Sequence, residues 1–271
     1  MTAPGAAGAR EKLVTEPTGG TFGGVLRSEL TKLRSVRSTM WTLLVAVFFV
    51  IGFGVLIGAV VDPSSQGRDF DPTQASLSGI FLAQLATGVL GVLVISSEYS
   101  TGMIRTSLAA VPRRKVLFIV KIITFGLVAF VVCTIAALIA FFAAQALMGP
   151  SISAGIGDPG VARAVVGASL YLTFIGLLGL ALGTLLRRTA GAITALFGVI
   201  FVVPIILNVI PVGWVNDLAR YAPADAGRSM LTVVHRASSG ELSPGVGFVV
   251  SLAWVVGALI LATIPLSRRD A

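Results

Sequence analysis

The side chains that could do chemistry in this chain gather in two segments. One is SEYSTGMIRTSLAAVPRRKVLFIVK, residues 97–121, which places acidic, basic and hydroxyl groups between two long apolar runs. The other is 213–245, which contains Asp225, His235 and Glu241. A histidine among carboxylates is the composition of a general acid–base site, whereas mixed charges beside apolar runs favour ion pairing and docking.

The acid–base interpretation has little support in the rest of the sequence. There is no HExxH, no GxSxG and no Cys/His cluster, and a lone histidine beside an arginine is more often a solvated surface residue. Cys133 is the single cysteine, so neither a disulfide within the chain nor a multi-thiol metal site can form. We therefore expect no enzyme here, with no catalytic, cofactor-binding or metal-binding residues.

The elements that must position these groups are membrane helices. Hydrophobic residues make up 55% of the chain, charged residues 12%, and the mean hydropathy is +0.95. About 20 apolar residues of helix cross a hydrocarbon core of about 30 Å. The alternation of a membrane barrel is absent from the apolar runs, so the expected fold is an all-α integral membrane protein. Its six predicted spans are Thr42–Val61, Leu77–Ser97, Val116–Met148, Val161–Leu186, Ala190–Val212 and Val246–Leu266.

The lysines and arginines predict the orientation of these spans. With the N-terminus inside, fifteen of the 20 basic residues fall on the cytoplasmic side and five on the other. Both termini are therefore expected in the cytoplasm. The basic residues are spread over several short loops, which favours anionic membrane lipids as partners and argues against nucleic acid.

The N-terminal region divides into two expected parts. Residues 1–21 predict a disordered cytoplasmic arm, and 22–41 predict an amphipathic helix on the membrane surface that leads into a six-helix domain at 42–271. Glu29 and Lys32 are its candidate functional residues. Glu29 projects near the middle of the apolar stripe, where an unpaired carboxylate is costly. We expect its partner in the loop around 105–114.

Two loops and four polar residues complete the candidates. The cytoplasmic loop 97–115 is expected to present a short helix over 103–110 that ends at Pro112, and 213–245 is the longest outer loop. The GxxxG pairs Gly54–Gly58 and Gly179–Gly183 are compatible with a helix interface. Four polar residues at membrane depth could line a pathway or join helices, namely Gln84, Thr87, Gln145 and Asn208.

Three segments, in this order along the chain, carry a resemblance to a known family: RSELTKLRSVRSTMW, the loop at 97–121 and the turn GTLLRRTAGA. Through them this sequence resembles the membrane subunit of type-2 ABC exporters. The resemblance runs from about residue 22 to 269 and implies that the loop at 97–115 couples the chain to an ATPase. Met103 departs from the family by replacing a frequent Ser or Thr. The residues implied in coupling are Glu98, Gly102, Met103, Arg105, Pro112 and Arg114.

The same resemblance implies the partners. The sequence contains no GxxxxGK[ST] phosphate loop, so ATP and Mg²⁺ are expected on a separate ABC ATPase subunit. A second permease half is expected, as a homodimer or a heterodimer, with an external gate in the outer loop. Arg outnumbers Lys, which indicates a bacterial source and hence the cytoplasmic (inner) membrane. The alternative is a non-transporting scaffold or sensory subunit of the same fold.

Overall fold

A computed structural model describes residues 22–62, 64, 67, 70–103, 114–210, 212–234 and 240–268 of the chain. The arm at 1–21, the loop residues 104–113 and His235 lie outside these ranges. Within the described ranges, helices are the only regular elements, and no strand occurs.

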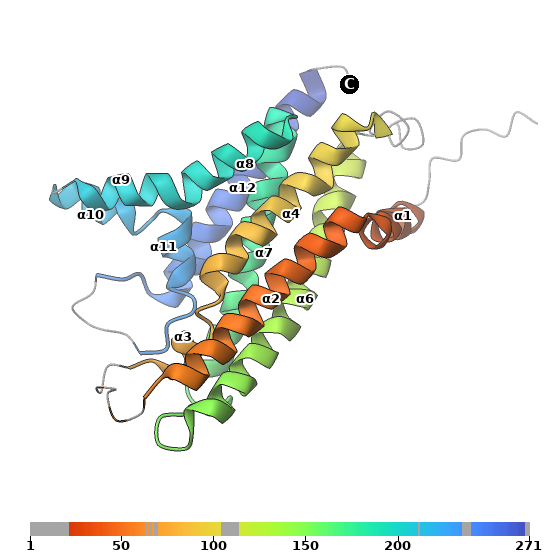
Figure 1. Ribbon diagram of the computed structural model, residues 1–271. Helices are drawn as coiled ribbons and strands as arrows, with labels where there is room; N and C mark the ends of the chain where they lie inside the picture. Colours follow the sequence, from red (N-terminus) through yellow and green to blue (C-terminus); the bar gives the residue numbers. More distant parts are fainter. Residues whose placement is uncertain are drawn as a thin grey trace, which may run out of the picture.

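Six segments are long and apolar enough to cross a membrane, as expected, so the chain is an all-α integral membrane protein. Between and beside them lie the short helices α1 (Phe22–Ser35), α3 (Pro72–Ser76), α10 (Gly213–Ala219) and α11 (Pro223–Arg228). The spans are α2 (Arg37–Val60), α4 (Ile80–Ser100), α6 (Arg114–Met148), α7 (Val161–Leu186), a fifth built from α8 (Thr189–Phe197), η2 (Gly198–Val202) and α9 (Val203–Val209), and α12 (Pro244–Arg268). Figure 1 shows α1 and the end of α12 at the same end of the bundle.

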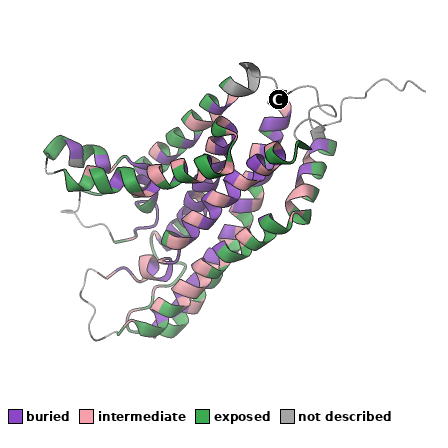
Figure 2. Ribbon diagram, turned by 45° about the horizontal axis from the view of Figure 1, so that its top comes forward, coloured by how far each residue is buried: buried purple, intermediate pink, exposed green. Residues whose placement is uncertain are grey.

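The centre of the bundle is the pair α4 and α7. In the most apolar stretch of α7, 78% of the residues are buried, and in that of α4, 67% are. The corresponding share for α2 is 22%. In Figure 2 the buried residues likewise concentrate in the centre of the bundle. Glycines let the two backbones approach closely, because a Cβ on Gly91 would lie 1.8 Å from the Gly176 oxygen. A Cβ on Gly179 would lie 2.2 Å from the Gly88 oxygen. Only glycine fits at these crossings.

Both predicted GxxxG pairs are used inside the chain. A Cβ on Gly54 would lie 2.5 Å from the Ser76 oxygen, and one on Gly58 would lie 2.7 Å from the α carbon of Ala144 in α6. Gly179 and Gly183 face α4 in the same way. The motif predicted close helix contact, but the contacts join helices of one chain and leave these glycines covered within it.

The predicted amphipathic helix ends earlier than expected. α1 ends at Ser35, and Val36 adopts an extended conformation that interrupts the helix. α2 then begins at Arg37 rather than after Trp41. The apolar side of α1 packs on protein, since Val25 lies in a buried cluster with Leu117 and Val120 of α6. These contacts on α6, which sequence periodicity could not specify, occupy part of the face that we expected to meet lipid.

The second half of the fifth span is irregular. Pro204 has no N–H to donate, and just before it the helix widens into a π turn in which the Val203 N–H bonds to the Gly198 oxygen. Figure 1 shows this span leaning away from α12, with α10 beside α9 at its far end. The chain then returns through α11 into the bundle.

Candidate functional site

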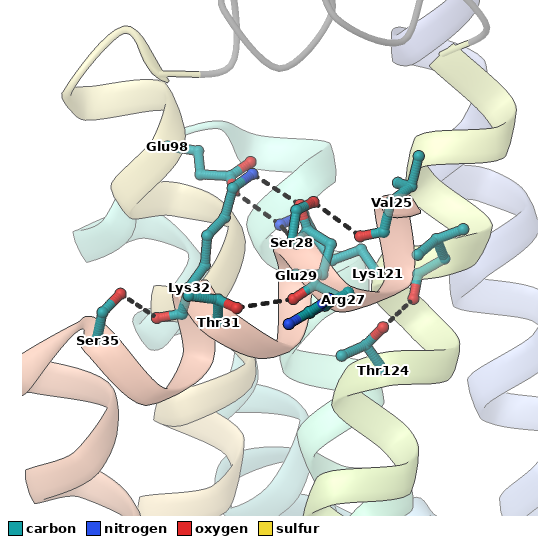
Figure 3. Close-up of polar contacts among 11 residues, drawn as sticks. Val25, Arg27, Ser28, Glu29, Thr31, Lys32, Ser35, Glu98, Lys121 and Thr124 are labelled. Atoms are coloured by element: carbon teal, nitrogen blue, oxygen red, sulfur yellow. Dashed lines mark hydrogen bonds and ion pairs between the residues drawn. The ribbon is translucent and has the colours of Figure 1, made fainter. Parts of the chain in front are cut away.

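Four charged side chains from three helices meet at the end of the bundle where α1 lies (Figure 3). We call Glu29, Lys32, Glu98 and Lys121 the ion-pair cluster. The Lys121 ammonium lies 2.6 Å from Glu29 Oε2 and 2.8 Å from Glu98 Oε1. The Lys32 ammonium lies 2.7 Å from Glu29 Oε1 and 3.2 Å from Glu98 Oε1. The cluster therefore ties α1, α4 and α6 together.

The cluster is neutral and shielded from water. The side chains of Glu29, Glu98 and Lys121 are each 3% exposed, and that of Lys32 is 27% exposed. A buried ion pair contributes little more to folding stability than apolar residues of similar volume would. Removing one partner nevertheless costs about 3–5 kcal/mol of stability, because the other charge is left buried without a partner. The arrangement therefore specifies how the three helices meet.

One atom of the cluster lacks a partner. Glu98 Oε2 is buried without a hydrogen bond in the described structure. A cavity of about 20 Å³ is bounded by all four cluster residues and by Met103, and a space of that size can hold one water molecule. The cluster thus adjoins the start of the loop that sequence analysis singled out.

The pKa shifts in α1 agree with ion pairing. Burial by itself raises the pKa of Glu29, but the charge of Lys121 and the hydrogen bonds from Lys121 and Lys32 outweigh it, and the net pKa is lowered. Burial by itself lowers the pKa of Lys32, but the hydrogen bond to Glu29 and the charge of Glu98 raise it overall. Both groups are held in their charged forms.

Local structure explains how the charges reach one place. α6 has 35 residues and is about 52 Å long, well beyond a hydrocarbon core of about 30 Å. Lys121 lies about two turns after its first residue, Arg114, so the excess length can carry Lys121 toward the edge of the apolar layer. Glu98 lies in the last turn of α4. That helix closes at Thr101, and Gly102 follows with φ of 71°, a conformation that favours glycine.

The coupling residues named from the sequence are only partly described. Glu98 joins the cluster, Gly102 ends α4, and Met103 is 38% exposed beside the small cavity. Arg105 and Pro112 lie outside the described ranges, and the Arg114 side chain is also undescribed. The structure gives Glu29 a partner beyond the 105–114 loop that we had named, because Lys121 in α6 binds its Oε2.

The polar side chains within the spans mostly form hydrogen bonds within their own helix or to a neighbouring helix. Thr87 bonds to the Ala83 and Gln84 oxygens of its own helix, and Asn208 bonds to the Pro204 oxygen. Gln84 accepts a hydrogen bond from the buried Tyr171 of α7 and so joins the two central helices. Gln84 and Asn208 also border cavities, whereas Thr87 borders none of those described.

Gln145 belongs to a polar clamp at the opposite end from the cluster. Its amide nitrogen donates to the Pro72 oxygen and to the Ser76 hydroxyl of α3, and its oxygen accepts from the Ala154 N–H. Arg163 on α7 donates to the carbonyl oxygens of Met230 and Thr232. Gln145 thus joins α6 to α3, and Arg163 fastens the segment after α11 to α7.

Sequence reasoning left two of the most connected residues without a role. Lys121 stood in the quoted loop motif, and its signal was a single cation inside an apolar run. Asp71 is buried, and its carboxylate accepts four backbone N–H bonds, two from α3 and two from residues 233 and 234. Its only signal in the sequence was its position before a proline, which predicts a helix cap. That signal does not predict the contact with residues 233 and 234.

Comparison with known proteins adds one finding. Residues 25–213, most of the chain, match the family described as ABC-2 family transporter protein. No curated protein matches the sequence. The matched region contains the whole ion-pair cluster and five of the six spans.

Proposed function

The chain belongs to the ABC-2 transporter family, and we propose that it is the permease subunit of an ATP-driven exporter in the bacterial cytoplasmic membrane. It is a multi-pass membrane protein, and its family implies an ABC transporter with a partner ATPase. ATP and Mg²⁺ bind the partner, and this chain forms half of the pathway. A second half comes from a copy of this chain or a sister permease.

The observation that carries the proposal is the ion-pair cluster. Glu98 stands at the start of the loop 97–115, and Lys121 lies one to two turns after its end. Closure of the ATPase subunits over ATP presses on this loop. Because Glu98 and Lys121 are both bound to residues of α1, the displacement is shared by α1, α4 and α6. A rigid joint at this place converts a local push into movement of whole helices.

The orientation that this mechanism needs follows from charge. The cluster end of the bundle holds α1 and the end of α12. Placing that end in the cytoplasm gives the topology that the sequence favours, in which fifteen of the 20 basic residues are assigned to the cytoplasmic side. The outer end then holds α3, α10 and α11. Both termini are cytoplasmic in this arrangement.

The test is ATP hydrolysis by proteoliposomes that contain the chain and its cognate ATPase. The native chain is compared with a variant in which residues 103–110 are all alanine. We expect the native chain to stimulate hydrolysis and the variant to lose the stimulation while still inserting into the membrane.

A scaffold or sensory subunit gives a different result. It would form a complex with the ATPase but leave the hydrolysis rate unchanged with either version of the loop. Stimulation that persists at the native level in the alanine variant would also contradict the proposed coupling through this loop.

A further inference from the structure

The outer end of the bundle contains a cavity of about 290 Å³ between the start of α4, α7 and α11. Much of its lining is apolar, including Leu77, Phe81 and Leu231. Phe81 is held edge-on against Phe201 of the fifth span, with ring centroids 5.6 Å apart. Sites of about 300–1,000 Å³ with few polar groups on apolar walls are typical of small-molecule binding.

The charge in this cavity has one sign. Among the described residues that border it, Arg228 alone carries a full charge, and no described carboxylate forms an ion pair with Arg228. Asp225 lies one turn earlier in α11, but it borders the adjoining larger cavity and not this one. The guanidinium therefore offers its donors to whatever occupies the cavity.

Two more polar groups border the same space. The Ser78 hydroxyl is buried and has no hydrogen-bond partner within the described part of the chain. Gln74 of α3 borders this cavity and also a larger one of about 430 Å³, as does Arg228. The larger cavity is also bordered by Asp225, Glu241 and Arg220. Arg228 thus borders both cavities, whereas Ser78 borders the smaller one.

The two sides of the cavity are fastened to each other. Asp71 Oδ1 accepts from the Thr73 and Gln74 N–H groups at 3.0 Å, and Oδ2 accepts from the Val233 and Val234 N–H groups at 2.8 and 3.1 Å. One carboxylate thereby links α3 to the segment that follows Leu231. The wall with Gln74 and the wall with Arg228 are held at a fixed separation without any ligand.

We propose that this cavity binds the anionic end of an amphipathic transport substrate, with Arg228 and Ser78 receiving the anion and the apolar wall receiving the rest. The inference rests on the proposed function, since it names the substrate class of the same permease. A charge-assisted hydrogen bond from Arg228 selects anions, and the apolar wall disfavours small hydrophilic ions.

The test is equilibrium dialysis of the purified full chain in phosphatidylcholine nanodiscs, with empty nanodiscs as the blank. The probes are naphthalene-2-sulfonate, its neutral counterpart 2-naphthalenemethanol and its cationic counterpart 2-naphthylmethylammonium. We expect the anion to bind saturably and at least about tenfold more tightly than either counterpart, the lower end of what one charged hydrogen bond contributes.

Variants assign the selectivity. Arg228→Gln should abolish the preference for the anion, and Arg228→Lys should keep part of it. Arg220→Gln is the matched control, because Arg220 is paired with Asp217 and does not border this cavity. Equal binding of the three probes, no saturable binding of the anion, or an undiminished preference in Arg228→Gln would overturn the proposal.

Dialysis needs neither ATP nor the ATPase, so its result does not depend on whether the proposed function is correct. Stimulated hydrolysis without anion binding would refute this site alone. Anion binding without stimulated hydrolysis would refute the coupled permease and leave a binding site in a protein of another role.

Discussion

Replacing Lys121 by Met should release α1 from the bundle. The Lys121 ammonium is bound at 2.6 and 2.8 Å to two carboxylates, and all three side chains are 3% exposed. Lys121→Met leaves Glu29 and Glu98 with the partly exposed Lys32 alone. Stranding a buried charge costs about 3–5 kcal/mol, so the undocked fraction of α1 should rise by a factor of about 100 or more.

The undocked fraction can be read from a buried thiol. Val25→Cys in a Cys133→Ala background places the thiol against Leu117 and Val120, where it reacts with a water-soluble maleimide only when α1 leaves α6. Gly23→Cys is the matched control, since position 23 is exposed and an added Cβ meets nothing within 4 Å. Its rate sets the upper limit for an undocked helix.

Lys121→Met should raise the rate at position 25 by about 100-fold, or up to that limit, and leave the rate at position 23 unchanged. Adding Glu29→Gln removes one stranded charge and keeps the Lys32–Glu98 pair at 3.2 Å, so the double variant should recover part of the protection. A rate at position 25 within about twofold of the parent in Lys121→Met would refute the reasoning.

Three further results are expected of the purified chain in nanodiscs. The pKa of Glu29 is lowered in the folded chain, so its ionised carboxylate contributes fully to folding stability above its ordinary pKa of 4.5. That contribution is lost as the pH falls through the lower pKa of the folded state. The Tm of the native chain should therefore fall more between pH 6 and 3 than the Tm of Glu29→Gln. Gly179→Ala should cost about 1–3 kcal/mol by thermal unfolding, because its Cβ would lie 2.2 Å from a backbone oxygen of α4, whereas Gly191→Ala, which meets nothing within 4 Å, should be neutral. Asp71→Asn turns one carboxylate oxygen, which accepts two N–H groups, into a donor and should cost about 2–4 kcal/mol. The exposed Asp158, whose carboxylate accepts an N–H bond from Gly155, is the control, and Asp158→Asn should cost less than about 0.5 kcal/mol. Equal Tm values for the two variants would contradict the role of Asp71.

Hydropathy was sufficient to predict the six spans, because a run of about 20 apolar residues has few alternatives to crossing the membrane. The boundaries were less well determined. The break before α2 lies at Val36, inside a stretch whose periodicity continues to Met40, and only the local backbone conformation marks it.

The candidate site was predictable only in part. The position of Glu29 on the apolar stripe of a helix correctly required a cation, since burying an unpaired carboxylate is costly. The identity of Lys121 was not predictable, since it lies 92 residues away and depends on which faces of α1 and α6 meet. Asp71 shows the same limit, because a cap can be read from its neighbours but the contact with residues 233 and 234 cannot.

The central claim is that the ion-pair cluster couples the ATPase to the membrane helices. Its most direct test is the rate of ATP hydrolysis by the reconstituted complex with Glu98→Gln in place of the native chain. Ser100→Ala is the matched control, because the exposed Ser100 hydroxyl bonds only to the Ser97 oxygen of its own helix. We predict an assembled complex in which Glu98→Gln loses most of the stimulation and Ser100→Ala keeps it; native stimulation with Glu98→Gln would contradict the claim.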